Sequence, residues 1–246
     1  IPVLCEVNDT LNMDPADLGK KITPRTKVIL VVHMAGAPAD MKRIMAIARK
    51  HRIAVLEDCA QCNGGSVGGK LVGTFGQVGM FSLQINKNCT TGEGGLLVTN
   101  DRDLYGRIMA AHDVGVPWKN GGCPIDTPYV MWGGGRRMSE LVGAVAAAQI
   151  RKLPTIVKNM HASNRRMRQM LAGTPGLTLR RLVDEQGDTG AFLIFSVADE
   201  ACALTSFQQM REAGLPAHRL ADYGMHVYYN IPQLVQKLPL SPAGNP

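Results

Sequence analysis

The amino-acid sequence predicts an α/β fold: a larger first domain built on a mostly parallel β-sheet, followed by a smaller α+β domain. Lys27–His33 (KVILVVH) is an unbroken apolar run rich in β-branched residues, which is typical of a strand buried on both faces. Met41–His51 follows with the apolar spacing of a helix, and Ile53–Leu56 is a second apolar run. A strand, a helix and a strand in this order predict a βαβ unit, whose ligands bind at the carboxyl ends of the strands.

Local signals predict the remaining elements of the first domain. Ile1–Val7 is predicted to be a strand, and Asp40 is placed to cap the helix of the βαβ unit. Gly64–Gly79 is rich in glycine and is predicted to be a loop. Gly79–Leu83 and Leu96–Thr99 are predicted to be short strands.

Helices dominate the middle of the sequence. Asp101–His112 is predicted to be a helix, and Val114–Gly135 to be a long loop rich in glycine and proline. Ser139–Leu153 is an alanine-rich helix that Pro154 is expected to interrupt, since proline lacks the backbone donor that a helix interior needs. Thr155–Leu171 is then expected to continue as a basic helix.

The pattern changes to α+β in the last third of the sequence. Leu177–Arg180 and Phe192–Val197 are predicted strands, and Thr205–Ala213 is a predicted helix. We therefore expect a large domain over residues 1–153, incomplete at its N-terminal side. A small C-terminal domain is expected over residues 154–246, incomplete at its C-terminal side.

Composition narrows the class of protein. With 246 residues, 45% hydrophobic and 19% charged, the chain has the composition of a globular protein, and no apolar run approaches the roughly 20 residues of a membrane span. The net charge is +7, but the basic residues form scattered pairs rather than a stripe. This distribution favours anionic substrates over nucleic acid.

The six cysteines suggest neither a disulfide framework nor a metal site. Cys59 and Cys62 form one C-x-x-C pair, without a second pair or a histidine at ligand spacing, which argues against zinc. The pair either fills space on a buried helical turn or belongs to a redox module. Cysteine usage of this kind suits a reducing cytoplasm.

Four residues between Ile53 and Thr99 have the chemistry of a pyridoxal 5'-phosphate (PLP) site. Asp58, after an apolar run, can keep the pyridine nitrogen protonated, and Ser82 can bind the phosphate. Lys87, in a segment of turn-forming residues, can bond covalently to the cofactor through its amine. Gln61 lies one turn after Asp58 and would face the same ligand. Each residue also has an ordinary interpretation: Asp58 as a helix cap and Lys87 as a solvated surface lysine.

Longer motifs give the sequence a family resemblance. They are DLGKKITPRTKVILVVHMAGAPADM, AVLEDCAQCNGG, GTFGQVGMFSLQINKNCTTGEGG and RRMSELVGAVAAAQIRKL. With these motifs the chain resembles the DegT/StrS-type sugar aminotransferases, PLP enzymes of the aspartate-aminotransferase fold (fold type I). The resemblance implies a three-layer α/β/α large domain and a homodimer with composite sites. It also implies that Lys87 bonds to PLP, Asp58 pairs with the ring nitrogen, Gln61 contacts the ring hydroxyl and Ser82 binds the phosphate.

The resemblance further implies the reaction: transfer of an amino group from an amino acid, expected to be glutamate, to a keto-sugar. Related dehydratases carry a histidine in place of the lysine, so the presence of Lys87 favours transamination. The motifs VHMAGAPADM and EDCAQCNGG are most similar to those of enzymes that aminate an oxidised octulosonate sugar. An 8-oxo-octulosonate is therefore the narrower expectation.

The sequence also departs from the family pattern. Family members are longer, and their upstream region carries a phosphate-binding loop and an aromatic residue that stacks on the cofactor. Gly135 stands two residues before Arg137, where the family often has an asparagine that reaches the neighbouring subunit's cofactor. These departures leave an alternative: a non-catalytic paralogue, or a partial subunit that lends residues to a composite site.

A few other residues are candidates with two interpretations. His33 ends a strand and lies near the site or is a satisfied core histidine. Glu93 is expected to stabilise its loop rather than take part in chemistry. His226, Tyr228 and Tyr229 either line a substrate pocket or form an aromatic stripe of the core.

Overall fold

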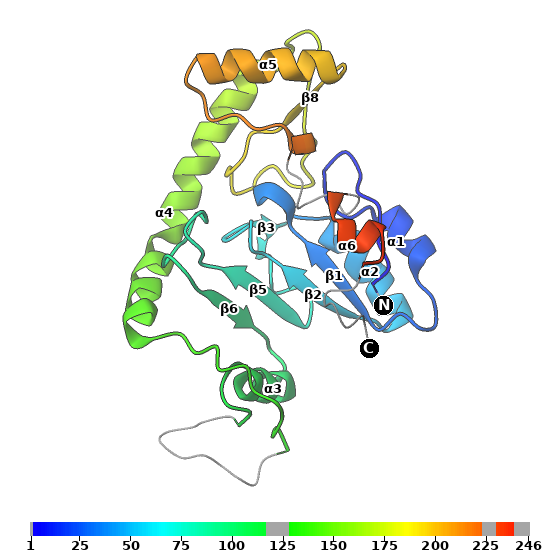
Figure 1. The fold of residues 1–246 in the computed structure, drawn as a ribbon, viewed down its shortest axis with the longest axis vertical. Helices are drawn as coiled ribbons and strands as arrows, with labels where there is room; N and C mark the ends of the chain where they lie inside the picture. Colours follow the sequence, from blue (N-terminus) through cyan, green and yellow to red (C-terminus); the bar gives the residue numbers. More distant parts are fainter. Residues whose placement is uncertain (1, 117–127, 223–229, 239–246) are drawn as a thin grey trace. The chain divides into compact units, whose positions relative to one another are not determined.

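The computed structural model describes residues 2–116, 128–222 and 230–238 of the chain (Figure 1). By their contacts the residues divide into two compact units. One unit comprises residues 1–172 and 179–194, and the other comprises 173–178 and 195–246. The domain boundary that the sequence places at residue 153 stays a prediction.

A four-stranded mixed sheet forms the centre of the first unit. Its strands are β1 (Val28–Val32), β2 (Ala54–Asp58), β5 (Val78–Ser82) and β6 (Gly95–Val98), in the order β1-β2-β5-β6. The first three pair in parallel and β6 pairs antiparallel to β5. The predicted α/β class, with a mostly parallel sheet, is therefore confirmed.

Helices α1 (Pro15–Lys21) and α2 (Met41–His51) bury their apolar sides in a core with one face of this sheet. The predicted cap is confirmed, because the carboxylate of Asp40 accepts a hydrogen bond from the N–H of Arg43 at 3.1 Å. Each large side chain in such a core contributes about 1.5–3 kcal/mol of transfer free energy. The core cluster consists of Leu18, Ile29, Val31, Ala39, Met41, Ile44, Met45, Ala48, Ile53, Val55 and Val67.

The opposite face of β1 is open. Val28, Leu30 and Val32 point to it, with exposed fractions of 48%, 50% and 38%. The parallel register places Val32 beside Asp58, and Asp58 beside Met80. Since paired residues share a face, the carboxylate of Asp58 stands on this open face, at its carboxyl edge.

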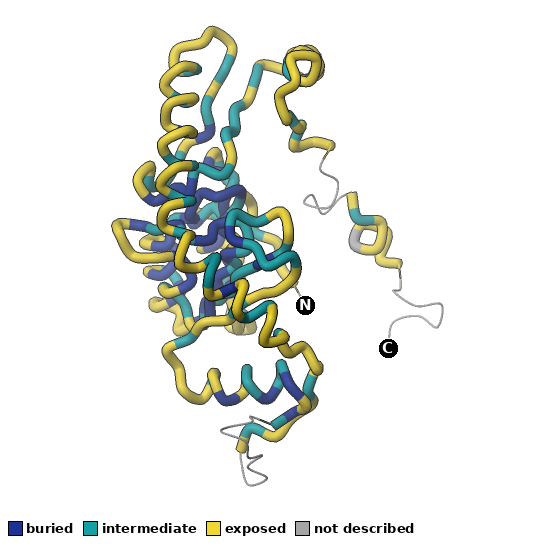
Figure 2. Tube along the Cα trace, turned by 90° about the vertical axis from the view of Figure 1, so that its left-hand side faces the viewer, coloured by how far each residue is buried: buried dark blue, intermediate teal, exposed yellow. Residues whose placement is uncertain are grey.

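Two further helices follow the sheet, α3 (Arg102–His112) and α4 (Glu140–Leu171). The expectation that Pro154 interrupts a helix is wrong, since α4 continues through it (Figure 1). Pro154 lies at an exposed position, so water can satisfy the carbonyl that proline leaves unpaired. The part of α4 that follows the proline is held by packing against Gly64. Val157 lies so close to Gly64 that a Cβ on this glycine would come within 2.9 Å of the valine side chain. Most of α4 is exposed (Figure 2).

Short elements complete the first unit. A 3₁₀ turn, η1 (Met34–Gly36), follows β1, and β3 (Ser66–Val67) pairs with β4 (Lys70–Leu71) inside the segment predicted to be a loop. The predicted strand Ile1–Val7 is wrong for the described residues, in which Val7 makes only an isolated bridge to Met13. Backbone groups of this segment bond to the local turn and to a side chain of α1 instead of to a strand.

The second unit is smaller. Strands β7 (Leu177–Leu179) and β8 (Phe195–Val197) pair, and α5 (Glu200–Glu212) packs against β8. Helix α5 begins earlier than predicted and β8 is shorter. The short elements η2 (Leu220–Asp222) and α6 (Pro232–Val235) follow. Among the described residues, no helix is long and apolar enough to cross a membrane.

Gly79 in β5 is expected to tolerate no side chain. A Cβ there would collide with the backbone oxygen of Gly73 and lie 2.8 Å from its carbonyl carbon. Gly79→Ala should therefore lower the free energy of unfolding by about 1–3 kcal/mol or more, measured by urea denaturation. Gly143→Ala is the matched control, because Gly143 is helical and no described residue beyond its own helical turn lies within 4 Å of its Cβ position. The control should gain up to about 1 kcal/mol, and equal losses in both variants would contradict this account.

Candidate functional site

The candidate site lies where the parallel strands β2 and β5 end. Asp58 is the last residue of β2 and Ser82 the last residue of β5. The strands stay paired up to this edge, because the N–H of Cys59 donates to the carbonyl of Met80 at 2.8 Å. The carboxyl edge of a parallel sheet is where α/β proteins bind ligands, so the structure brings Asp58 and Ser82 to such an edge.

Asp58 is half-buried and caps no helix. One carboxylate oxygen accepts a hydrogen bond from the N–H of Ala60 at 2.9 Å. Hydrogen-bonded turns follow instead of the expected helical turn: the N–H of Cys62 bonds to the carbonyl of Cys59 at 2.8 Å. The second carboxylate oxygen has no partner among the described residues and can accept a hydrogen bond from a ligand.

Gln61 is oriented by the turn that follows β1. Its Oε1 accepts a hydrogen bond from the N–H of Ala35 at 2.9 Å. Ala35 lies in η1 with φ and ψ both near 50°, a left-handed conformation that is costly for a residue other than glycine. With Oε1 engaged, the Nε2 group of Gln61 remains as a hydrogen-bond donor, which is the chemistry needed to bind an anionic oxygen.

Ser82 and Lys87 belong to the connection between β5 and β6. The hydroxyl oxygen of Ser82 accepts from the N–H of Gln84 at 3.3 Å, which leaves its own O–H free to donate. Lys87 sits in a turn closed by its N–H to the carbonyl of Gln84 at 2.9 Å and is half-buried rather than fully solvated. Among the described residues Lys87 Nζ makes no hydrogen bond or ion pair, so no such bond joins this amine to Asp58, Gln61 or Ser82.

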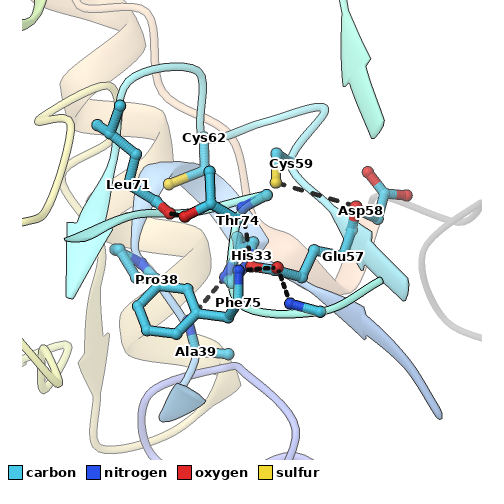
Figure 3. Close-up of polar contacts among 12 residues, drawn as sticks. His33, Pro38, Ala39, Glu57, Asp58, Cys59, Cys62, Leu71, Thr74 and Phe75 are labelled. Carbon is cyan, nitrogen blue, oxygen red and sulfur yellow. Dashed lines mark hydrogen bonds and ion pairs between the residues drawn. The ribbon is translucent and has the colours of Figure 1, made fainter. Parts of the chain in front are cut away.

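Glu57, the neighbour of Asp58, holds the backbone around the candidate site in place. It was not among the residues expected from the sequence. Its side chain is fully buried and its carboxylate accepts four hydrogen bonds (Figure 3). Oε1 accepts from the N–H groups of Phe75 and Gly76 at 2.7 and 2.6 Å. Oε2 accepts from the N–H of Gly73 at 2.8 Å and lies 3.2 Å from Nε2 of His33. Glu57 therefore fixes the loop that leads into β5 against β2.

The structure decides between the two interpretations of His33. Its Nδ1 accepts from the N–H of Ala39 at 3.0 Å, so the ring proton is on Nε2 and is donated to Glu57. Both ring nitrogens are used and the ring is fully buried, which makes His33 a satisfied core histidine. The potential ligand atoms of His33, Glu57 and Cys59 lie within 4.8 Å of one another, but the imidazole and carboxylate are already hydrogen-bonded. This group does not fit a metal ion.

Two opposing effects act on the pKa of Glu57. Burial raises the pKa, and the hydrogen bonds from His33 and from the backbone N–H groups of Gly76 and Gly73 lower it. The hydrogen bonds outweigh burial, so the pKa lies below the usual value for a glutamate. Glu57 is thus a carboxylate that stays ionised inside the fold.

Cys59 and Cys62 are both fully buried. Burial raises the pKa of each thiol well above the usual value, with further increases from Glu57 near Cys59 and from Asp188 near Cys62. Reactive cysteines are accessible and have lowered pKa values. The pair therefore has the properties of space-filling core residues, and not those of a redox module.

The other candidates that the structure describes, Gly135 and Glu93, lie outside the helices and strands. Gly135 has a φ of 59° and nothing near its Cβ position, while Arg137 pairs with the buried Asp113 at 3.2 Å. The contact of this segment with a neighbouring subunit stays a prediction. Glu93 is exposed, and its carbonyl accepts a hydrogen bond from the hydroxyl of Thr91 at 2.7 Å, within the loop. His226, Tyr228 and Tyr229 lie outside the described residues.

Comparison with known proteins agrees with this architecture. The model of the DegT/DnrJ/EryC1/StrS aminotransferase family matches residues 1–245, so the chain belongs to this family. A GDP-perosamine synthase of Escherichia coli O157:H7 is 40% identical over 147 residues, which cover 58% of this chain and 38% of that enzyme. An L-glutamine:2-deoxy-scyllo-inosose aminotransferase of Streptomyces kanamyceticus is 39% identical over 160 residues, which cover 62% of this chain and 37% of that enzyme.

Solved structures show the same fold. The E. coli GDP-4-keto-6-deoxy-D-mannose-3-dehydratase with bound hydrated PLP superposes with a TM-score of 0.75 at 26% identity, covering 85% of this chain and 57% of that one. A Helicobacter pylori aminotransferase involved in the biosynthesis of pseudoaminic acid gives a TM-score of 0.80 at 22% identity, covering 98% and 64%. The family is one of PLP-dependent enzymes. The chain spans less than two thirds of the length of each of these relatives.

Glu57→Gln is expected to destabilise the protein strongly. The amide would turn a donor toward N–H groups that need an acceptor, and unfolding free energy should fall by about 3 kcal/mol or more. The pKa of Glu57 is lower in the folded protein than the usual glutamate value of 4.5, so its stabilisation is present above about that pH. It is lost as the pH falls further through the folded pKa. Urea denaturation between pH 3 and 7 should show this loss of stability in acid for the natural protein and a shallower loss for the variant.

Glu93→Gln, at an exposed carboxylate, is the control and should behave like the natural protein. A Glu57→Gln variant that also behaves like the natural protein would refute the role of Glu57.

Proposed function

We propose that this chain carries the cofactor lysine of a PLP-dependent aminotransferase that transfers an amino group from an amino acid to a keto-sugar. Membership of the DegT/DnrJ/EryC1/StrS aminotransferase family supports the reaction class. The observation that carries the proposal is local: Asp58 and Ser82 end neighbouring parallel strands, and Lys87 follows five residues later in a hydrogen-bonded turn.

The donor and acceptor groups at this edge fit PLP. The free oxygen of Asp58 can accept a hydrogen bond from a protonated ring nitrogen, and a half-buried carboxylate keeps that nitrogen protonated. Gln61, with its Oε1 held by Ala35, offers its amide N–H groups to the ring hydroxyl. The free hydroxyl proton of Ser82 suits a phosphate oxygen. Each of these side chains thus offers a donor or an acceptor of the kind that the corresponding group of PLP needs.

The roles of the side chains follow from their chemistry. PLP, when bound, supplies an electron sink for the negative charge that develops at the substrate carbon. Asp58 holds the proton at the ring nitrogen. Lys87 would hold the cofactor covalently through Nζ, and as a free amine it would take a proton from the amino-bearing carbon of the donor and deliver it to the former aldehyde carbon of the cofactor. The half-buried position of Lys87 limits the water around this amine.

The substrates are proposed from the relatives and from the motifs. The two enzymes compared above are named for an amino sugar and for a glutamine-dependent reaction on an inosose. We therefore propose a keto-sugar acceptor and glutamate or glutamine as amino donor. An 8-oxo-octulosonate is the narrower candidate, carried by the motifs VHMAGAPADM and EDCAQCNGG. A homodimer in the cytoplasm completes the proposal.

Lys87 is expected to be the lysine that captures PLP. Mixing the protein with PLP, reducing with borohydride and mapping the peptides should place the label on Lys87 about ten-fold or more faster than on the exposed Lys70, because bound geometry raises the effective concentration of the aldehyde. Lys87→Arg should abolish that label, and Lys70→Arg should leave it unchanged. Labelling spread evenly over the surface lysines would overturn the proposal and favour a non-catalytic relative.

Asp58→Asn is expected to separate cofactor binding from catalysis. The amide keeps the size of the side chain but cannot hold a positive charge at the ring nitrogen. Capture of PLP by Lys87 should persist, while kcat for amino transfer should fall roughly a hundred-fold or more. The measurement is the rate at which the amino donor converts the absorbance of the bound cofactor, in a single turnover. An unchanged rate would show that Asp58 is not the partner of the ring.

A further inference from the structure

A buried asparagine links the two ends of the segment that carries Lys87. Nδ2 of Asn63 donates to the backbone carbonyl of Ser82 at 3.0 Å, at the end of β5. The backbone carbonyl of Asn63 accepts from Nδ2 of Asn88 at 2.9 Å, one residue beyond Lys87. Asn63 is 3% exposed and sits in the turns that follow Asp58 and Gln61. One residue therefore bonds to the start of this segment and to its tip.

The bond to Ser82 fixes the orientation of the Asn63 side chain. Among the described residues its Oδ1 is buried and has no hydrogen-bond partner. Exchanging the amide nitrogen and oxygen would place Oδ1 against the carbonyl of Ser82, so the orientation is fixed by that bond. An open acceptor of this kind is compatible with the fold because the donor on the same amide is used.

Helix α4 contacts the rest of the segment that carries Lys87. Leu83 and Cys89 are buried in a cluster with Ala146 of α4. The side chain of Gln149, also on α4, donates to the carbonyl of Thr90 at 3.1 Å. The N–H of Thr91 bonds to the carbonyl of Leu83 at 2.9 Å and closes the loop. Helix α4 thus contacts the segment at Leu83, Cys89 and Thr90. Asn63 instead bonds to Asn88, the residue after Lys87.

We propose that Asn63 is the positioning residue for Lys87. It fixes the tip of the segment, and with it the backbone of Lys87, relative to the end of β5 that carries Ser82. The unpaired Oδ1 is tolerated because the other end of the same amide holds Ser82. The inference rests on the proposed function of Lys87, but the link itself is a property of the protein without cofactor.

The test replaces one atom. Asn63→Asp keeps the size of the side chain and turns an acceptor toward the Ser82 carbonyl, so the bond to the end of β5 is lost while the backbone carbonyl of residue 63 can still accept from Asn88. Without cofactor, hydrogen exchange of the amides of residues 83–92 should accelerate about five- to ten-fold, the factor expected for one lost hydrogen bond. With PLP and borohydride, labelling of Lys87 should fall by a similar factor while labelling of Lys70 stays unchanged. Asn63→His should restore both, because an imidazole Nδ1–H can donate from the same distance along the side chain.

Asn164→Asp is the matched control. Asn164 is 2% exposed and its Nδ2 donates to the carbonyl of Phe192 at 2.8 Å, outside the Lys87 segment. The control should lose global stability without changing exchange or labelling in residues 83–92. If Asn63→Asp behaves in the same way, the role of Asn63 is merely structural and the proposal is overturned.

A second variant keeps the test decisive if Asn63→Asp does not fold. Asn88→Ala removes the bond at the tip from a half-buried residue and should produce the same local acceleration of exchange. Unchanged exchange in Asn88→Ala would also overturn the proposal. Local acceleration together with unselective labelling of Lys87 in the natural protein would retain the positioning role and refute the proposed function.

Discussion

The structure around the candidate site depends on one buried carboxylate. Glu57 accepts three backbone hydrogen bonds from the loop over residues 73–76 and one from His33. An unpaired charge in this position would cost several kcal/mol. With four donors in place, Glu57 joins the end of β2, the residue after β1 and the loop before β5. These are the three pieces of chain whose relative positions define the carboxyl edge of the sheet.

The geometry of a β-strand connects this anchor to the site. Successive residues of a strand point to opposite faces, so Glu57 enters the core while Asp58 faces the ligand side. A rigid anchor and an accessible acid can thus be consecutive residues. The same logic applies to the turn after β1, where His33 is locked in the core and Ala35, two residues on, orients Gln61. The side chains proposed to touch the cofactor are held by neighbours that do not.

Local sequence patterns predicted the helices and strands whose formation depends on residues close together in the chain. The spacing of apolar residues predicted the bounds of α2, and the order of strand, helix and strand predicted ligand binding at the carboxyl end of the strand after which Asp58 comes. Pro154 was misjudged because packing against Gly64 and its neighbours overrides a local helix breaker. Interactions over long sequence separations could not be predicted in this way.

Glu57 shows why. In the pair Glu57-Asp58 either acid could be the buried one, and the partners that decide it lie 16 to 24 residues away. One signal was present: Val55 and Glu57 share a face by the period of two, and Val55 is apolar. Asn63 has no such signal, since its partners are one backbone carbonyl and one side chain supplied by a loop.

The open face of β1 links the stability of the fold to its chemistry. Val28, Leu30 and Val32 are 38–50% exposed, although strands of a parallel sheet are buried on both faces in α/β proteins. Asp58 stands on the same face, so its carboxylate is in contact with water. A carboxylate that holds a proton on a ring nitrogen acts most strongly where water is excluded. The residues that cover this apolar face, wherever they come from, therefore complete the site as well as the core, because burying Val32 also removes water from Asp58 beside it.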